Sequence, residues 1–307
     1  MHFFDKRILS ATAVSLTLAL GACGDGGGGE QTGAETEPEQ TAAPADNGAR
    51  LDAVLAGDHR TSEERARDEW RHPKETLLFF GLEPEMTVVE IAPGGGWYTQ
   101  VIAPYLKTGG GKLYATGFPP DGASERALAA NKTFTQTYVE QPEIYGDVEL
   151  TYFGEGHHVA PEGAADMVLT FRNVHNWQSR GQAADAFAEF YRALKPGGVL
   201  GVVEHRADGA EIADDGSTGY VYTDDVIELA TNAGFDLDMA SEINANPADT
   251  KDHPFGVWTL PPVKRSSAIR GQDDPDFNRA PYDAIGESDR MTLKFRKPIA
   301  ADGALLE

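Results

Sequence analysis

Short apolar runs alternate with longer amphipathic stretches along the chain from about residue 87 onward. Runs rich in β-branched residues predict strands at residues 87–92, 112–116, 148–153, 165–171, 199–204, 235–243 and 290–296. Helical spacing of apolar positions predicts helices between them at residues 97–106, 124–140, 182–194 and 223–233. Strands that alternate with helices imply a mostly parallel sheet. The pattern therefore predicts an α/β fold with a doubly wound sheet of seven strands.

A helical preface is predicted before the first strand, at residues 51–82. Thr61 and Glu64 have the spacing of a capping box. Pro73 marks a helix start or break, and Gly81 stands where a helix should stop. Lys195 to Gly198, with the sequence KPGG, is predicted as a turn that leads into the fifth strand.

A long proline-rich segment separates the last two strands. Six prolines fall between residues 245 and 288, and a loop of this length is usually functional or disordered. The sixth strand, if parallel, ends at the ligand-binding edge of the sheet, so the segment begins there. With Phe255, Trp258 and Tyr282 it is predicted to form a lid over a substrate, and a solvated insertion is the alternative.

The first residues predict export. Lys6 and Arg7 precede an unbroken run of apolar and small residues from Ile8 to Leu20, and the sequence LGAC then ends at Cys23. This pattern is typical of a lipoprotein signal peptide, residues 1–22, and the run is too short for a resident transmembrane helix. Cys23 is the single cysteine, which excludes an intramolecular disulfide and favours acylation of the thiol over a free exported thiol. We expect a lipid-anchored, extracytoplasmic protein of the cell envelope, on the periplasmic face in a Gram-negative bacterium.

Residues 23–50 are predicted to be a disordered tether, followed by one domain at residues 51–300. Residues 24–49 contain six acidic side chains and no basic one, a composition typical of a flexible, self-repelling segment. The net charge of the chain is −23, and it becomes −24 without residues 1–22, which carry two basic and one acidic side chain. Such a surface excludes nucleic acid as a favoured partner and leaves the lipid anchor as the only membrane contact. No protein partner is indicated.

A glycine turn follows the first predicted strand. Pro93-Gly94-Gly95-Gly96 leaves the carboxyl end of that strand and opens a helix, which is where doubly wound sheets bind ligands. An ordinary tight turn is the alternative. A dinucleotide fingerprint requires a sixth-position glycine where Thr99 stands, which argues against a nicotinamide-dependent oxidoreductase.

Three motifs resemble those of class I S-adenosylmethionine-dependent methyltransferases. Counted from Glu90, the turn reads E-x-A-x-G-x-G, with Ala92 at the place of the superfamily's first glycine. Residues 164–177, AADMVLTFRNVHNW, resemble the fourth-strand motif, and residues 192–205, RALKPGGVLGVVEH, resemble the entry to the fifth strand. The resemblance implies a Rossmann-like methyltransferase fold and S-adenosylmethionine as cofactor.

A narrower resemblance, to a family of predicted and often exported bacterial methyltransferases, covers most of residues 60–298. It is carried by R-D-x-x-R-x-P from Arg67 to Pro73, by FFGL at residues 79–82, by PGGGWY at residues 93–98 and by residues 290–298. It implies the fold and leaves the methyl acceptor open.

The resemblance also assigns cofactor-binding roles to eleven residues. These are Glu90, Ala92, Pro93, Gly94, Gly95, Gly96, Trp97, Tyr98, Thr116, Gly117 and Asn173. Superfamily members usually end the second strand with an acidic residue that accepts the ribose hydroxyls. Here the strand ends Ala115-Thr116-Gly117-Phe118, and Asp121 comes late, so the ribose contact is a departure from the pattern.

Four polar residues at the ends of the fourth and fifth strands are the catalytic candidates. They are His175, Asn176, Glu204 and His205. Methyl transfer requires alignment more than covalent catalysis, and a nucleophile that loses a proton benefits from a histidine base. Structural roles in loop hydrogen bonding or capping are the alternative for each. His157 and His158 lie in a loop after the third strand, and with His175 and His205 they form no compact ligand motif, so no metal is predicted. A metal site formed by these four histidines at one edge of the sheet is the alternative.

The predicted function is S-adenosylmethionine-dependent methyl transfer to a small acceptor. The alternative is a non-catalytic, ligand-binding lipoprotein that retains the fold. Arg67, Asp68 and Arg71 have the spacing of ion pairs within a helix, and a second possibility is that they close over the carboxylate of the cofactor.

Overall fold

The computed structural model describes residues 46–209, 212–213 and 215–299. All described residues belong to one compact unit. The predicted signal peptide, Cys23 and residues 24–45 of the predicted tether lie outside the described residues.

Seven strands lie side by side in the order β3-β2-β1-β4-β5-β9-β7. Their bounds are β1 (Thr87–Ile91), β2 (Lys112–Gly117), β3 (Asp147–Tyr152), β4 (Ala165–Phe171), β5 (Leu194–Ala207), β7 (Asp236–Ser241) and β9 (Arg290–Arg296). A two-residue strand, β6 (Val221–Tyr222), pairs with the end of β5. Only β9 runs antiparallel to its neighbours β5 and β7, while the other strand pairs are parallel. The predicted doubly wound, mostly parallel sheet is confirmed.

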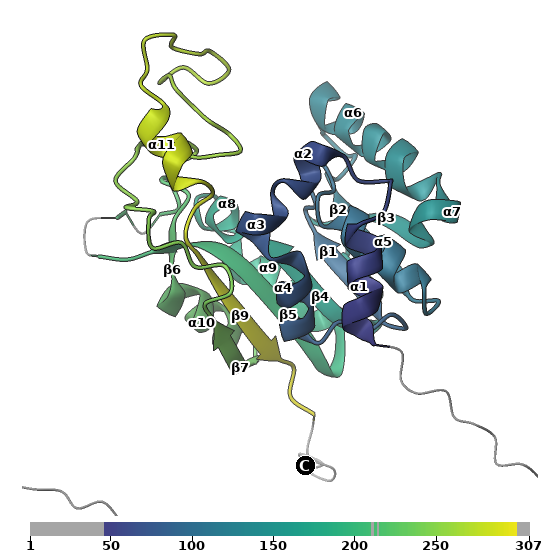
Figure 1. Ribbon diagram of the computed structural model, residues 1–307. Helices are drawn as coiled ribbons and strands as arrows, with labels where there is room; N and C mark the ends of the chain where they lie inside the picture. Colours follow the sequence, from purple (N-terminus) through teal and green to yellow (C-terminus); the bar gives the residue numbers. More distant parts are fainter. Residues whose placement is uncertain (1–45, 210–211, 214, 300–307) are drawn as a thin grey trace, which may run out of the picture. The chain divides into compact units, whose positions relative to one another are not determined.

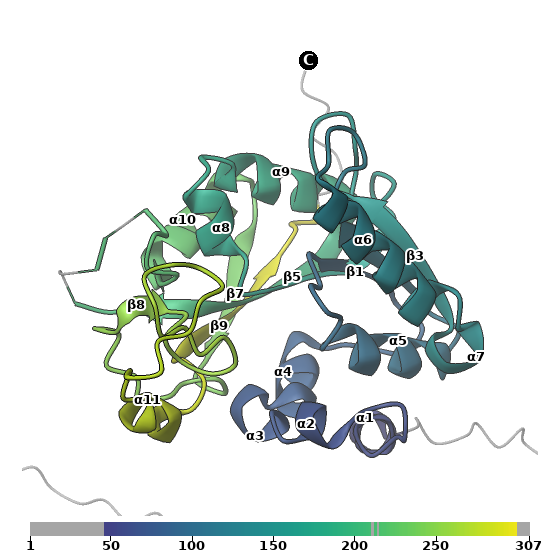
Figure 2. The same cartoon turned by 90° about the horizontal axis from the view of Figure 1, so that it is seen from above.

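Helices cover both faces of this sheet (Figures 1 and 2). One face carries α1 (Asn47–Leu55), α4 (Pro73–Phe80) and α5 (Thr99–Lys107), and the other carries α8 (Val174–Gln178), α9 (Ala183–Ala193) and α10 (Thr223–Asn232). Strand side chains alternate between the two faces, so the neighbours Val88 and Val89 are both buried but in different cores. Each face of the sheet therefore has its own apolar core, and the polar residues of the site collect at the strand ends.

Five further α-helices lie among the described residues. They are α2 (Ser62–Arg65), α3 (Asp68–Arg71), α6 (Glu125–Phe134), α7 (Pro142–Tyr145) and α11 (Ala280–Ile285). The predicted helix at residues 124–140 is interrupted, because a π-helical turn, η1 (Thr135–Val139), follows α6. Among the described residues, no helix has the length and apolar character needed to cross a membrane.

The helical preface is confirmed in detail and begins earlier than predicted. The backbone N–H of Glu64 donates to the Thr61 hydroxyl at 3.2 Å, and the Glu64 carboxylate accepts from the Thr61 N–H at 2.7 Å. Pro73 is the first residue of α4, and Gly81 ends that helix with φ +82°. The boundary placed between residues 50 and 51 is wrong, because Asp46 caps α1 through the Gly48 N–H at 2.9 Å and residues 47–50 are helical.

The predicted turn at Lys195–Gly198 is instead a bulge within β5. Leu194 pairs with Ala165 and Val199 pairs with Met167, so the residues between them have no regular partner in β4. Two backbone bonds to Lys297, from the Gly197 N–H at 2.8 Å and to the Gly198 carbonyl at 2.9 Å, hold the bulge in place. The strand consequently begins at its apolar Leu194, before the glycines.

The proline-rich segment contains a short strand, β8 (Pro254–Val257), and helix α11. Figure 1 shows α11 above the upper end of β9, on the side of the sheet that carries β9 and β7. Its buried Asp249 carboxylate accepts hydrogen bonds from the Tyr220 hydroxyl at 3.0 Å and from the Asp289 N–H at 2.8 Å, and it lies 2.7 Å from His253 Nε2. A buried carboxylate satisfied by partners from three parts of the chain ties the segment to the body of the protein.

Candidate functional site

The turn after β1 has an unusual backbone. Ala92, Gly94 and Gly96 have φ values of +47°, +62° and +82°, a region that costs a residue with a side chain about 1–2 kcal/mol. The positive φ of Ala92 explains why the corresponding methyltransferase motif has glycine at this position. The Ala92 N–H donates to the Thr116 hydroxyl at 2.7 Å, which fixes the turn against the end of β2.

Two cavities meet at this turn. The first, of about 990 Å³, extends along the end of β2 past Thr116 and Gly117. The second, of about 590 Å³, extends along the ends of β4 and β5 past His175 and His205. Both are lined by Ala92, Pro93, Gly94, Asn173 and Asn176. A side chain at Gly94 would have no neighbour within 4 Å, so a ligand can approach the bare backbone there.

Eight of the eleven predicted cofactor residues line one or both cavities. They are Ala92, Pro93, Gly94, Gly95, Trp97, Thr116, Gly117 and Asn173. Glu90, Gly96 and Tyr98 line neither cavity and lie behind the turn. Burial raises the pKa of Glu90 to about 7, and its carboxyl group accepts from the Thr99 hydroxyl at 2.6 Å. Tyr98 stacks on Phe171 with ring centroids 3.6 Å apart. The three residues lie behind the turn in this structure, and their contact with a cofactor stays a prediction.

Gly96 is covered by a residue that the sequence did not single out. The Tyr138 hydroxyl, from η1, donates to the carbonyl oxygens of Gly95 at 2.9 Å and Gly96 at 3.3 Å. A Cβ atom at Gly96 would lie 2.3 Å from the Tyr138 hydroxyl oxygen. The turn is thus held from below by a helix more than 40 residues further along the chain, and no local sequence pattern indicates this contact.

Asp121 does not replace the missing acid at the end of β2. Its exposed carboxylate lies 3.2 Å from His157 Nε2 and does not line the first cavity. The carboxylates in that wall come from other elements, at Glu155, Asp185 and Glu189. The departure from the superfamily pattern therefore persists in three dimensions.

His175 and Glu204 form a buried pair at the second cavity. The Glu204 side chain is fully buried and lies 3.1 Å from His175 Nδ1. It also accepts the backbone N–H groups of Val174 at 2.5 Å and His205 at 2.9 Å. Because a carboxylate only accepts hydrogen bonds, this contact places a proton on Nδ1 and leaves Nε2 as the basic nitrogen.

The four predicted catalytic residues lie close together, but only three of them line the second cavity. His175, Asn176 and His205 line the second cavity, while Glu204 lies behind His175. Burial, and then repulsion from His175, lowers the pKa of His205 well below its usual value, so this ring is neutral near pH 7. Potential metal-binding atoms of His175, Glu204 and His205 lie within 4.8 Å of one another. His157 and His158 do not join them, because they lie beside the first cavity near Asp121 and Glu189.

A cluster of arginines surrounds Glu287 in the wall of the second cavity. The Glu287 carboxylate lies 2.9 Å from Arg67 Nε, Arg71 Nε and Arg290 Nη2. Burial works to raise the pKa of Glu287, but Arg290 and then the other arginines hold it at about 2. The predicted ion pairs among Arg67, Asp68 and Arg71 are wrong: Asp68 pairs with Arg60 at 2.6 Å, and both other arginines reach across to Glu287.

Only part of the predicted lid reaches the site. Trp258 lines the second cavity, with its ring centroid 6.0 Å from that of His175, as do Val257, Pro261 and Pro262. Phe255 and Tyr282 pack instead on Phe277 within the insertion.

Comparisons with known proteins agree with this architecture. No protein-family model and no curated protein sequence matches the chain. Among solved structures, the [4+2]-cyclase SpnF is similar at 18% identity and a TM-score of 0.51, over 80% of this chain and 86% of SpnF. A putative sarcosine dimethylglycine methyltransferase from Galdieria sulphuraria gives 15% identity and 0.49, over 77% and 88%. A SAM-dependent methyltransferase from Aquifex aeolicus gives 17% and 0.44, over 64% and 93%. The strand order and the likeness to SpnF show that the chain has the Rossmann-like methyltransferase fold.

Proposed function

We propose that the protein is an S-adenosylmethionine-dependent methyltransferase acting on a small acceptor. The observation that carries this proposal is the meeting of two cavities at Gly94. The larger cavity has the size of a cofactor site, and the smaller one contains a histidine positioned by a buried carboxylate. A methyl donor in the larger cavity and a methyl acceptor in the smaller one would meet beside Gly94.

The chain's own residues supply alignment and proton transfer. S-adenosylmethionine, when bound, supplies an electrophilic methyl carbon. Ala92 to Gly94 and Asn173 would hold it from the side of the turn, since they line the shared wall. Nε2 of His175 would take the proton of an acceptor hydroxyl or amine, and Glu204 would stabilise the resulting imidazolium. Bringing the two reactants into line accounts for much of the acceleration that such a reaction needs.

Isothermal titration calorimetry with S-adenosylmethionine and S-adenosylhomocysteine tests this proposal. We expect both to bind, and Gly94→Ala to weaken both by about tenfold or more, equal to about 1.4 kcal/mol, because the added methyl group enters the cavity. Gly163→Ala is the matched control, since Gly163 has the same φ of +62°, has open space around it and lines neither cavity. Absence of binding to the wild-type protein would contradict the proposal.

A binding protein without catalysis is the second candidate. It is favoured by one observation: the end of β2 places no carboxylate in the first cavity, where superfamily members hold the ribose. Native mass spectrometry of protein isolated from the envelope distinguishes the two. A retained ligand other than S-adenosylmethionine or S-adenosylhomocysteine would favour the binding protein.

We further propose that the domain is anchored outside the cytoplasm through a lipidated Cys23. The support is the sequence of residues 1–23 alone. S-adenosylmethionine is made in the cytoplasm, so an exported enzyme requires a supply of it across the membrane.

Mass spectrometry of the mature amino terminus tests the anchor. We expect a diacylated Cys23 in the membrane fraction, and we expect the Cys23→Ser variant to lose the acyl mass and to leave that fraction. An unmodified Cys23 in the mature wild-type protein would overturn the proposal.

A further inference from the structure

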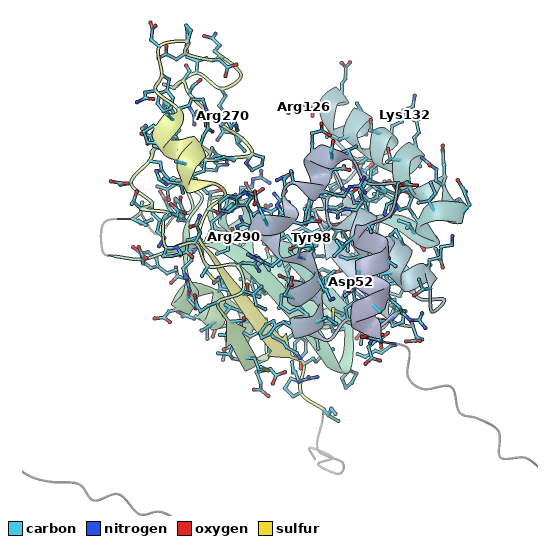
Figure 3. All side chains as sticks on the ribbon, viewed as in Figure 1. Asp52, Tyr98, Arg126, Lys132, Arg270 and Arg290 are labelled. Carbon is cyan, nitrogen blue, oxygen red and sulfur yellow. The ribbon has the colours of Figure 1, made fainter. Side chains whose placement is uncertain are left out.

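The second cavity has a positively charged wall in a strongly acidic protein. The chain carries a net charge of −23, yet Arg67, Arg71 and Arg172 line this cavity, and the buried Arg290 shares their carboxylate Glu287. Arg290 is buried, whereas Arg126 and Lys132 on α6 are exposed (Figure 3). The other carboxylate residue of the wall, Glu64, has its side chain engaged by the Thr61 N–H.

Arg172 is the least satisfied member of the cluster. Its Nη1 atom is buried and has no hydrogen-bond partner in the part of the chain that the structure describes. Its backbone has a φ of +63°, which is rare for a residue with a side chain. A buried guanidinium without a full set of partners is unfavourable, and strained residues of this kind cluster at ligand sites. Arg172 therefore behaves as a residue arranged for a ligand.

The arginines repel one another. Burial, and then the charge of Arg290, lowers the pKa of Arg172. Burial, and then the charge of Arg172, lowers the pKa of Arg71 well below its usual value. One Glu287 carboxylate lies among four guanidinium groups, so a second anion in this cavity would be stabilised by the charges left over.

Part of the remaining wall is apolar. Trp97 packs under the guanidinium of Arg71, 4.6 Å from its ring centroid. Trp258, Val257, Pro261 and Pro262 line the side of the insertion. A ligand with one acidic group and an apolar body would match both halves of the cavity.

We propose that the second cavity binds a small, largely apolar organic acid, whose carboxylate is held by Arg172 and Arg71 and whose hydroxyl or amine group meets His175. Naming this acid as the methyl acceptor rests on the proposed function; its binding does not. The competing occupant is the carboxylate of S-adenosylmethionine, and the titration below distinguishes it from the carboxylate of an acceptor. An acidic acceptor supplies the missing charge.

Calorimetric titration of the purified protein with benzoate, in the presence of saturating S-adenosylhomocysteine, tests the proposal. Benzamide is the neutral probe of the same shape. We expect benzoate to bind about tenfold or more tightly than benzamide, and Arg172→Gln to remove this preference. Arg172→Lys should retain part of it, and Arg126→Gln, an exposed change on α6, should leave it intact.

Thermal unfolding separates a binding role from a structural one. Since Arg172→Gln removes a half-buried charge whose Nη1 atom has no hydrogen-bond partner among the described residues, we expect its melting temperature to be equal to or above that of the wild-type protein. A fall in melting temperature with the preference for benzoate unchanged would overturn the proposal.

The remaining outcomes are also decisive. Benzoate binding that saturating S-adenosylhomocysteine abolishes would assign the arginines to the cofactor's own carboxylate and overturn the acceptor site. Binding of inorganic phosphate without binding of benzoate would overturn the choice of an apolar acid. Benzoate binding to a protein that binds no S-adenosylhomocysteine would refute the proposed methyl transfer and leave the acid site standing.

Discussion

Replacement of Glu287 by glutamine is expected to destabilise the protein by about 3–5 kcal/mol, the usual effect of removing one partner from a buried ion pair. The carboxylate, whose side chain is 4% exposed, contacts Arg67, Arg71 and Arg290. Without it, the guanidinium groups around it keep their mutual repulsion and lose their shared counter-ion. Urea unfolding monitored by circular dichroism measures the change.

The matched control is Glu242→Gln. Glu242 also pairs with an arginine, Arg206, at 2.8 Å, but its side chain is 70% exposed. An exposed pair contributes about 0–1 kcal/mol, so this variant should unfold nearly as the wild-type protein does. Equal losses of unfolding free energy in the two variants would show that burial of Glu287 among the arginines adds nothing to the stability of its ion pairs.

The same carboxylate predicts a dependence on pH. The pKa of Glu287 is lowered from 4.5 to about 2 in the folded protein. A depressed pKa contributes stability that is complete above the unfolded value and lost as pH falls through the folded value. The wild-type protein should therefore lose about 3 kcal/mol between pH 5 and pH 2 that Glu287→Gln does not lose. Parallel profiles for the two proteins would contradict this assignment.

Gly96→Ala is the second change with a large expected effect. It places a side chain at φ +82° and a Cβ atom 2.3 Å from the Tyr138 hydroxyl oxygen. The backbone contributes about 1–2 kcal/mol of destabilisation, and displacement of the tyrosine ring adds about 1–3 kcal/mol. Since Tyr138 donates to the carbonyls of Gly95 and Gly96, the turn should shift and binding of S-adenosylhomocysteine should weaken with it.

Gly110→Ala isolates the contribution of the ring. Gly110 has a similar φ of +78° but open space around its Cα, so its replacement should show the backbone penalty alone, with ligand binding unchanged. Calorimetry and thermal unfolding of the two variants give the comparison. A Gly96→Ala protein no less stable than Gly110→Ala would mean that Tyr138 does not support the turn.

The sheet could be predicted because its signals are local. Runs of β-branched and apolar residues marked all seven strands of the main sheet, and the glycine turn was placed correctly after β1. The bulge at Lys195–Gly198 could not be predicted, because bonds to Lys297 hold it. The structure of the insertion depends in the same way on Asp249, which is satisfied by Tyr220 and Asp289.

In the site, too, the contacts that depend on local sequence signals could be predicted, and the contacts between distant residues could not. His175 and Glu204 could be expected to meet, since the carboxyl ends of adjacent parallel strands lie at one edge. The ion pair of Arg71 with Glu287 spans 216 positions, and helical spacing pointed to local partners instead. Arg172 lies within the fourth-strand motif, directly before Asn173. Its left-handed backbone conformation is visible only in the structure.

Residues 287–290 join parts of the protein that are made at different times. Glu287 binds the preface, Ser288 lies 2.5 Å from His205 Nδ1, Asp289 contacts Arg206, and Arg290 begins the last strand. Glu287 and Ser288 also line the second cavity, so a growing chain that has completed the glycine turn still lacks this part of the wall until they emerge and dock. A chain that stops before them can bury much of its sheet and yet lack part of the wall of the second cavity, so occupancy of that cavity by a ligand would report that the last strand has been added.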